Sequence, residues 1–256
     1  MSYAPLKRLT GRIAIVTAST DGIGFAIAQR LAQEGAKVII SSRKQNNVEK
    51  ATKSLKNEGL DVRGLVCHVA KAEDRKKLFD EATKIGGLDI LVSNAAVSTT
   101  VGGVLDCTED HWDKIFDVNV KSSFLLAKEA LPLLRKSKAG RIIFISSIAG
   151  FHPSEFLGAY SVSKTALLGL TKAAAVQLAR ENITVNSVAP GLIETKFAEP
   201  ITSNEEVVKI AVPMIPMGRV GKPRDISGIV AYLASDDGSY VTGENMIIAG
   251  GMSSRL

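Results

Sequence analysis

The chain has 256 residues, of which 45% are hydrophobic, 23% charged and 5% aromatic, and its formal net charge is +6. This length suits one α/β domain with a large aliphatic core. The basic residues are scattered at the spacing of solvated helix faces, and no basic run is interleaved with aromatic residues, so nucleic-acid binding is not expected. No stretch approaches the roughly 18 apolar residues of a membrane span, and the first ten residues lack the apolar segment of a signal peptide. We therefore expect a soluble protein without a membrane partner.

The cysteines and histidines do not predict a metal site. Cys67 and Cys107 have no metal-type pairing, and we expect both to be reduced thiols. His68, His111 and His152 form no ligand motif and are interpreted as structural.

Short β-branched runs alternate with helical segments from one end of the chain to the other. The predicted strands span residues 12–17, 37–41, 62–68, 89–93, 141–146, 184–189 and 246–249. The predicted helices span residues 25–35, 47–59, 72–85, 109–136 and 160–181. Continuous apolar strands separated by helices are typical of a parallel sheet that is covered on both faces. The sequence therefore predicts one doubly wound Rossmann-type domain over residues 1–256, with a seven-stranded parallel sheet.

Two features stand out from this alternation. Residues 191–219, with Pro200, Pro213 and Pro216, form one long irregular insertion, which we interpret as a lid on the substrate side. The helical segments 112–134 and 165–179 are apolar over most of their circumference, so each must be buried on two sides. The sheet covers one side, and a subunit interface could cover the other, which indicates an oligomer.

A glycine-bearing turn follows the first predicted strand directly and opens a helix. It reads Thr-Ala-Ser-Thr-Asp-Gly-Ile-Gly over residues 17–24. Glycines allow the backbone to turn tightly and to approach a pyrophosphate, and the helix N-terminus offers N–H groups to that charge. The strand–turn–helix context at the first βα junction therefore predicts a dinucleotide site. The residues of the turn that we expect at the cofactor are Thr17, Ser19, Gly22, Ile23 and Gly24.

The end of the second predicted strand indicates which dinucleotide is bound. In dinucleotide-binding folds an acidic residue about 20 positions after the turn accepts the ribose hydroxyls. Ser42 occupies that place here, and Arg43 and Lys44 follow it. A carboxylate would repel a 2′-phosphate, whereas serine and arginine can bind it through charge-assisted hydrogen bonds. NADPH (or NADP) is therefore expected rather than NADH.

A tyrosine and a lysine lie one helical turn apart at the start of a predicted helix. Tyr160 and Lys164 share a helix face at the i, i+4 spacing. A free tyrosine titrates near ~10, and an adjacent ammonium lowers that pKa toward the working range of a proton donor. Ser147 stands at the end of the fifth predicted strand, at the edge of a parallel sheet where ligands bind.

With these residues assembled, the sequence resembles the short-chain dehydrogenase/reductase family over essentially its full length. The family's motifs match the turn 17–24, Asn94-Ala95-Ala96, Asn119, Ser147, Tyr160, Lys164, and Pro190-Gly191 with Thr195 following. The resemblance implies that Ser147 hydrogen-bonds the substrate carbonyl oxygen and that Tyr160 donates the proton. It also implies that Lys164 holds the nicotinamide ribose and tunes Tyr160, while Asn119 anchors a water that relays protons to Lys164. Further cofactor contacts are implied for Asn94, Tyr160, Lys164, Pro190, Gly191, Ile193 and Thr195.

Three residues depart from the family's usual pattern. Ala18 replaces the first glycine of the turn, Ala96 replaces the glycine of Asn-Ala-Gly, and His68 replaces an aspartate that commonly contacts adenine. These departures are similar to those of the peroxisomal tetrameric carbonyl reductase branch, the NADPH-dependent retinol dehydrogenase/reductases. That branch similarly reads Ser-Arg-Lys after the second strand and ends in Ser-Arg-Leu, as Ser254-Arg255-Leu256 does here. The resemblance implies a homotetramer, and the tail predicts capture by the peroxisomal import receptor, with the cytoplasm as a second location.

The function that these residues predict is reduction of a ketone or aldehyde by NADPH. By resemblance the substrates are aromatic ketones, α-dicarbonyls or retinal-like carbonyls, and apolar residues are expected to wall the pocket: Phe151, Phe156, Leu192, Phe197, Met214 and Met217. Reduction of 3-oxoacyl thioesters would use the same four catalytic residues. A non-catalytic NADPH-binding scaffold is a second alternative, although such proteins typically lose one of the four. RNA binding through the net charge is a third, which the scattered basic residues do not favour and which a salt-sensitive gel shift would have to support.

Overall fold

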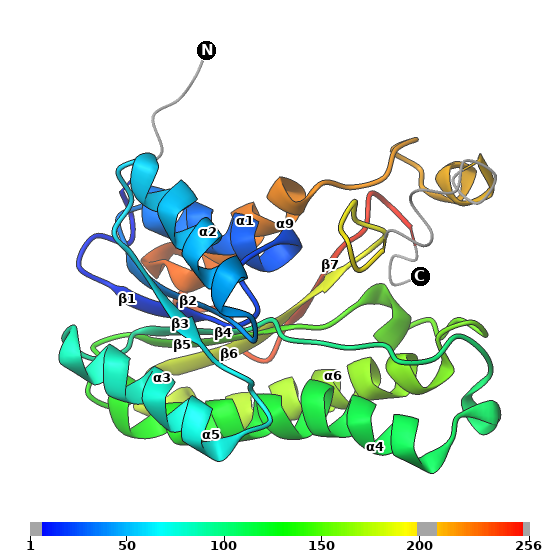
Figure 1. The fold of residues 1–256 in the computed structure, drawn as a ribbon, viewed down its shortest axis with the longest axis horizontal. Helices are drawn as coiled ribbons and strands as arrows, with labels where there is room; N and C mark the ends of the chain where they lie inside the picture. Colours follow the sequence, from blue (N-terminus) through cyan, green and yellow to red (C-terminus); the bar gives the residue numbers. More distant parts are fainter. Residues whose placement is uncertain (1–6, 199–208, 253–256) are drawn as a thin grey trace.

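The computed structural model describes residues 7–198 and 209–252 (Figure 1). Seven parallel strands form one sheet in the order β3-β2-β1-β4-β5-β6-β7. They are β1 (Ile13–Val16), β2 (Lys37–Ser42), β3 (Val62–Val66), β4 (Ile90–Ser93), β5 (Gly140–Ile145), β6 (Ile183–Pro190) and β7 (Asn245–Ile248). The predicted fold class, a Rossmann-type parallel sheet with helices on both faces, is confirmed.

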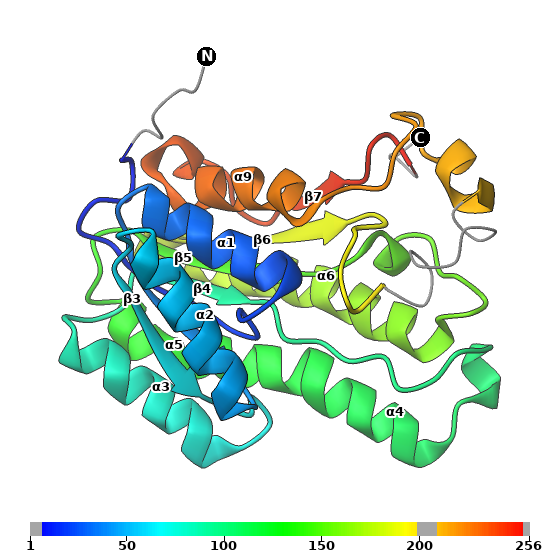
Figure 2. The ribbon, with the colours of Figure 1, turned by 45° about the horizontal axis from the view of Figure 1, so that its top comes forward.

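Helices cover both faces of this sheet (Figures 1 and 2). One face carries α1 (Gly22–Gln33), α2 (Gln45–Asn57) and α9 (Pro223–Ala234). The other carries α3 (Ala72–Lys84), α4 (Glu109–Phe116), α5 (Ser122–Leu134) and α6 (Gly158–Leu178). Among the described residues, no helix is long and apolar enough to cross a membrane.

The strands are apolar on both faces because each face closes its own core. Along β1, Ala14 and Val16 pack into the core beneath α1 and α9, whereas Ile15 points into the opposite core with α3 and α5. Successive side chains of a strand point to opposite faces, so two apolar layers require an uninterrupted apolar strand. This is why the strands read as short β-branched runs rather than as alternating patterns.

The structure differs from the expected elements in two places. Helix α9 was not among the predicted helices; it begins at Pro223, with the Asp225 carboxylate accepting a hydrogen bond from the Lys222 N–H at 2.8 Å. The expected helix over residues 109–136 is divided by a π-helical turn, η2 (Asp117–Lys121), between α4 and α5. Single π turns inside helices often occur at functional sites, and this one carries Asn119.

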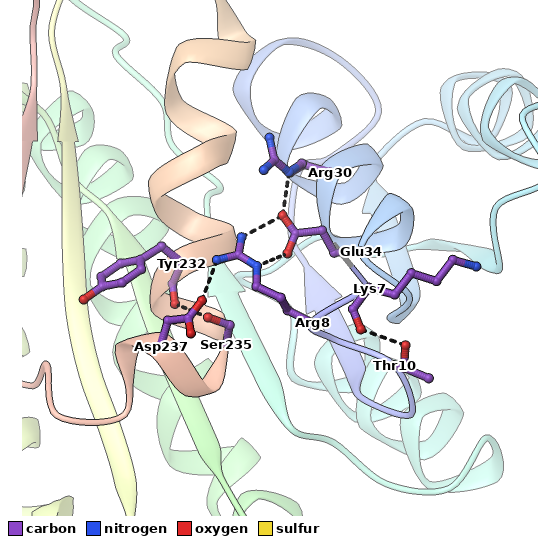
Figure 3. A network of polar contacts seen from close by, with 8 residues as sticks. All are labelled: Lys7, Arg8, Thr10, Arg30, Glu34, Tyr232, Ser235 and Asp237. Carbon is purple, nitrogen blue, oxygen red and sulfur yellow. Dashed lines mark hydrogen bonds and ion pairs between the residues drawn. The ribbon is translucent and has the colours of Figure 1, made fainter. Parts of the chain in front are cut away.

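A buried carboxylate ties three segments together at the amino end of the sheet (Figure 3). The Glu34 side chain is 1% exposed and accepts hydrogen bonds from Arg8 at 2.7 and 2.8 Å and from Arg30 at 2.6 Å. Arg8 also pairs with Asp237 at 2.9 Å, so the segment before β1 and the end of α1 are joined to η6 (Asp236–Gly238). Burial acts to raise the pKa of Glu34, but the two arginines outweigh it and lower the pKa. This network lies at the opposite edge of the sheet from the carboxyl ends of the strands.

Candidate active site

The carboxyl ends of β1 and β4 meet at the point where the chain changes direction across the sheet. β1 leads through α1 to β2 on one side, and β4 leads to β5 on the other. In open α/β sheets, ligands bind in the crevice above such a switch point. A cavity of about 240 Å³ lies here, and the predicted site residues among its walls are Gly22, Ile23, Gly24, Asn94, Ser147, Tyr160, Lys164, Pro190 and Thr195.

The turn after β1 is tight and is held to the neighbouring strand. Ala18 and Gly22 both have positive φ, at 48° and 56°. For Ala18, a residue with a side chain, this left-handed conformation costs roughly 1–2 kcal/mol. Ser19 is buried, and its Oγ donates to the Val16 carbonyl at 2.5 Å and accepts from the Ser41 N–H at 3.0 Å. The Ser19 hydroxyl therefore binds β2 and shapes the turn rather than facing the cavity.

Asn94 joins the loop after β4 to the turn after β1; we call this set of hydrogen bonds the Asn94 clamp. Its Nδ2 donates to the carbonyls of Thr17 and Ala18, both at 3.0 Å. The Thr17 hydroxyl in return accepts from the N–H groups of Asn94 at 3.0 Å and Ala95 at 3.2 Å. A Cβ added at Gly24 would lie 2.4 Å from the Ala18 carbonyl oxygen and 2.5 Å from Asn94 Nδ2. Gly24 is thus required by the clamp.

Asn119 links the loop after β4 to the start of α6. Its fully buried side chain accepts from the Val97 N–H at 2.8 Å and donates to the Val97 carbonyl at 2.9 Å and to Ser163 Oγ at 3.0 Å. Ser163 in turn donates to the Tyr160 carbonyl at 2.6 Å. The Asn119 side chain therefore sets the position of Tyr160 through Ser163. This positioning role is separate from the expected role of Asn119, which was to anchor a water that relays protons to Lys164.

Tyr160 and Lys164 lie together on α6, where both are buried. Lys164 Nζ donates to the Ile145 carbonyl at the end of β5 at 2.8 Å and lies 5.4 Å from the Tyr160 ring centroid. Burial lowers the pKa of Lys164 to about 7. Burial also raises the pKa of Tyr160 to about 12, and a hydrogen bond with Ser147 opposes the rise. The expectation that the Tyr160 pKa is lowered toward the working range is therefore wrong for this structure, because loss of hydration raises this pKa and the hydrogen bond with Ser147 only partly opposes the rise.

Ser147 stands between the strand and the helix that hold the other two residues. It is the N-cap of η3 (Ile148–Gly150), and its Oγ accepts from the Ala149 N–H at 3.1 Å. The neighbouring Ser146 donates to the Lys164 carbonyl at 2.9 Å and so fastens α6 to the end of β5. Ser147, Tyr160 and Lys164 are thus brought to one wall of the cavity.

The segment after β6 closes another side of the cavity. Pro190 and Thr195 line it, whereas the Ile193 side chain packs into the core beneath α1 and α9. Gly191 lies against Ala249, since a Cβ added there would be 2.8 Å from the Ala249 Cα. Gly191 and Ile193 therefore support the wall rather than form it.

Two neighbouring residues of this segment also line the cavity: Lys196, which was not expected from the sequence, and Phe197, which was expected in the pocket wall. Lys196 Nζ pairs with Asp21 at 2.6 Å, and the Phe197 ring centroid lies 5.6 Å from that of Tyr160. No motif marks Lys196, because its contact with Asp21 joins segments far apart in the chain.

Ser42 and Arg43 lie away from the catalytic wall, at the end of β2. Ser42 is half-buried, and Arg43 is exposed on the turn that leads to α2. Cys67, the residue that follows β3, donates its N–H to the Ser42 carbonyl at 2.9 Å.

Comparisons with known proteins agree with this geometry. The family model described as enoyl-(acyl carrier protein) reductase matches residues 17–253. Human dehydrogenase/reductase SDR family member 4 is 52% identical over 249 residues, covering 97% of this chain and 90% of the relative. The chain belongs to the short-chain dehydrogenase/reductase family. The human SDR family member 2, described as mitochondrial, is 50% identical over 249 residues, covering 97% of this chain and 88% of that protein.

A solved short-chain dehydrogenase/reductase structure has the same fold. The enzyme from Mycobacterium marinum has a TM-score of 0.91 and 33% identity, and the match covers 98% of each chain. As a member of this family the chain is an oxidoreductase that uses NAD or NADP.

The walls of the cavity suit such a dinucleotide. The first turn of α1 lies at the carboxyl edge of the sheet, and Gly22 takes the left-handed conformation that lets a backbone approach a ligand closely. A helix N-terminus in this position favours a pyrophosphate. Gly22, Ile23, Asn94 and Thr195 line this cavity together with Tyr160 and Lys164.

We expect Gly24→Ala to damage dinucleotide binding. The added methyl group would push apart Ala18 and Asn94, so affinity for NADP should fall about tenfold or more, with a loss of about 1–3 kcal/mol in the free energy of unfolding. Titration of NADP and urea unfolding measure the two effects.

The matched control is Gly228→Ala in α9, where an added Cβ meets nothing within 4 Å. It should leave NADP binding unchanged and keep or raise stability, because alanine is about 1 kcal/mol better than glycine inside a helix. If Gly24→Ala bound NADP as tightly as Gly228→Ala, the clamp would not set the cofactor turn.

Proposed function

We propose that this protein reduces ketones and aldehydes to alcohols with NADPH, using Tyr160 as the general acid. The observation that carries the proposal is the placement of a buried phenol, with its pKa raised to about 12, on the wall that Ser147 and Lys164 share. A tyrosine that stays protonated is suited to giving a proton to a reduced carbonyl oxygen. The presence of Asn119, Ser147, Tyr160 and Lys164 argues against a non-catalytic scaffold.

Each residue has a defined task in this reaction. When bound, NADPH supplies the hydride that reduces the carbonyl carbon. The Ser147 hydroxyl hydrogen-bonds the carbonyl oxygen, and Tyr160 transfers its phenolic proton to that oxygen, so the product is an alcohol. Lys164, held by the Ile145 carbonyl at 2.8 Å, stabilises the phenolate that remains and can return a proton to it. Because burial lowers the pKa of Lys164 to about 7, both of its protonation states are accessible near neutral pH.

NADPH is preferred in this proposal because of the residues that follow β2. Ser42 stands where a carboxylate would exclude a 2′-phosphate, and Arg43 is exposed beside it. Charged hydrogen bonds of the kind that Arg43 can donate contribute about 1.5–3 kcal/mol each.

The proposed substrates are apolar carbonyl compounds: aromatic ketones, α-dicarbonyls and retinal-like aldehydes. The Phe197 ring packs near Tyr160 and lines the cavity, and Phe156, Met214 and Met217, which the sequence places in the pocket wall, are exposed apolar side chains. Methionines at such a wall accept ligands of several shapes. We further propose that residues 1–256 form one domain and that its insertion at residues 191–219 acts as a lid on the substrate side. Residues 199–208 of this lid lie outside the described residues.

A homotetramer is proposed from the resemblance to the peroxisomal branch and from the surface of two helices. Both helices are largely apolar, and each exposes an apolar side chain: Phe124 on α5 is 46% exposed and Val176 on α6 is 84% exposed. Burial of such side chains in a subunit interface would remove apolar area from water. Location in peroxisomes is proposed from Ser254-Arg255-Leu256, which lies outside the described residues.

Tyr160→Phe should remove most reduction while NADPH still binds. The ring can pack as before but has no proton to give, and a well-placed acid contributes ~100- to 10,000-fold to the rate. NADPH oxidation measured with ketones, dicarbonyls, retinal and acetoacetyl thioesters tests both this step and the substrate class. The control is Tyr240→Phe, at a fully exposed tyrosine. Parental turnover in folded Tyr160→Phe would sink the mechanism, and activity confined to thioesters would favour the 3-oxoacyl alternative.

Cofactor preference should reverse when Ser42→Asp is combined with Arg43→Leu. The new carboxylate repels the 2′-phosphate and its cationic partner is gone, so the ratio of kcat/KM values should shift at least about tenfold toward NADH. The control pair Lys53→Leu with Ser54→Asp makes the same charge change at exposed positions of α2. An unchanged ratio in the Ser42/Arg43 variant would mean that the 2′-phosphate is bound elsewhere.

Deletion of residues 254–256 should abolish peroxisomal import without changing the purified enzyme. A receptor reads the C-terminal tripeptide as an address, so activity and oligomer size should stay at parental values. Imaging in cells and size-exclusion chromatography measure the two properties. Continued import of the truncated chain on its own would show that the tripeptide is not the address. Dissociation of the oligomer would assign the tail a structural role first.

A further inference from the structure

Lys196 is a second cation at the cavity, and its partner lies on the turn after β1. Among the described residues that line the cavity, Lys164 and Lys196 are the basic residues and Asp21 is the acidic one. Lys164 is buried beside Tyr160 and takes part in the proposed reaction. The Lys196 side chain is 82% exposed, and its Nζ lies 2.6 Å from Asp21 Oδ2. Neither Asp21 nor Lys196 acts on the carbonyl in the proposed reaction, so the pair has another role.

The Asp21 carboxylate binds two donor groups at once. Asp21 is the N-cap of α1, and its Oδ1 accepts from the Gly22 N–H at 2.8 Å. Its other oxygen pairs with Lys196, and this hydrogen bond lowers the pKa of Asp21, so the carboxylate is charged at neutral pH. A helix N–H and an ammonium are also the donors that a phosphate takes at a helix N-terminus. The carboxylate and a phosphate are therefore alternative ligands of the same groups.

The segment that carries Lys196 lies against the turn after β1. Residues 192–194 are fixed to Gly221 by two backbone hydrogen bonds, at 2.9 and 3.0 Å. Beyond this anchor the segment reaches α1, since a Cβ added at Gly22 would lie 3.2 Å from Thr195 Cγ2. Because the Lys196 side chain is largely exposed, its ammonium can change partner without a change in the fold.

We propose that Lys196 binds the pyrophosphate of the dinucleotide, and that Asp21 holds its ammonium until this ligand arrives. The inference rests on the binding of a dinucleotide in this cavity, which is part of the proposed function. On binding, a phosphate oxygen replaces the Asp21 carboxylate as the partner of the ammonium, and no covalent bond changes. An exposed ion pair is weak, whereas a phosphate at this place also gains the field and the N–H groups of the helix N-terminus. Asp21 thus competes with the dinucleotide for Lys196.

This exchange predicts effects of opposite sign for the two partners. Asp21→Asn keeps an oxygen that can cap α1 but removes the competing charge, so NADP and NAD should each bind about twofold to fivefold more tightly. Lys196→Met keeps an unbranched side chain but lacks the ammonium, so both dinucleotides should bind at least about twofold more weakly. In the Asp21→Asn background nothing competes for the ammonium. There the same lysine replacement should weaken binding about tenfold or more.

Calorimetric titration with NADP and with NAD measures these constants in the parent, the two single variants and the double variant. Both positions are exposed, so each variant is expected to fold, and urea unfolding checks this. The matched controls are Lys76→Met and Asp80→Asn on α3, at the opposite face of the sheet from α1. Their ion pair spans 2.7 Å, and its side chains are 75% and 51% exposed. The controls make the same charge changes and should bind both dinucleotides as the parent does.

The outcomes distinguish this exchange from a pair that only holds the segment in place. Single variants that leave dinucleotide binding unchanged, or that change it in the same direction with no further effect in the double variant, would overturn the exchange. An effect of Lys196→Met on NADP alone would assign Lys196 to the 2′-phosphate and would also overturn it. A parent that binds neither dinucleotide would overturn the proposed function itself.

Discussion

The hydrogen bonds of the Asn94 clamp are the constraint on which the site depends. They hold the turn after β1 and the loop after β4 at a fixed separation above the switch point of the sheet. Gly24 packs against both, so α1 begins where its N-terminus faces the cavity. From the same loop, Val97 binds Asn119, and Asn119 reaches α6 through Ser163. The dinucleotide turn and the proposed acid are thus placed by one connected set of polar contacts.

Burial determines the protonation of the two residues at the centre of the proposed chemistry. Tyr160 and Lys164 are both withdrawn from water between α6 and the end of β5, and loss of hydration favours the uncharged form of each. The tyrosine is therefore kept as a proton donor, while the pKa of the lysine is brought to about 7. A reductase needs the pKa of the tyrosine to lie above that of the lysine, because the proton must be on the phenol before the carbonyl is reduced.

The buried ion pairs that stabilise the fold and the residues of the proposed site lie at opposite ends of the sheet. At the amino end, Glu34 is buried and bound by Arg8 and Arg30, and removing one partner of such a group typically costs about 3–5 kcal/mol. At the carboxyl end, Ala18 takes a left-handed conformation and Lys164 is buried without a carboxylate partner among its recorded contacts in the described residues. The cores on both faces of the sheet and the network around Glu34 compensate for this local cost.

The sequence by itself determined the parallel sheet, because continuous β-branched runs separated by helices have few other ways to bury both faces. It also located the turn 17–24 and the pair Tyr160 and Lys164, since local spacing defines both. It did not predict α9, and it gave no sign of the π turn that interrupts the helix around Asn119. The directions of the Tyr160 and Lys164 pKa shifts, the support role of Ser19 and the contacts of Lys196 and Phe197 came only from the tertiary structure. Each depends on burial or on a partner distant in the chain, and neither quantity is encoded in local spacing.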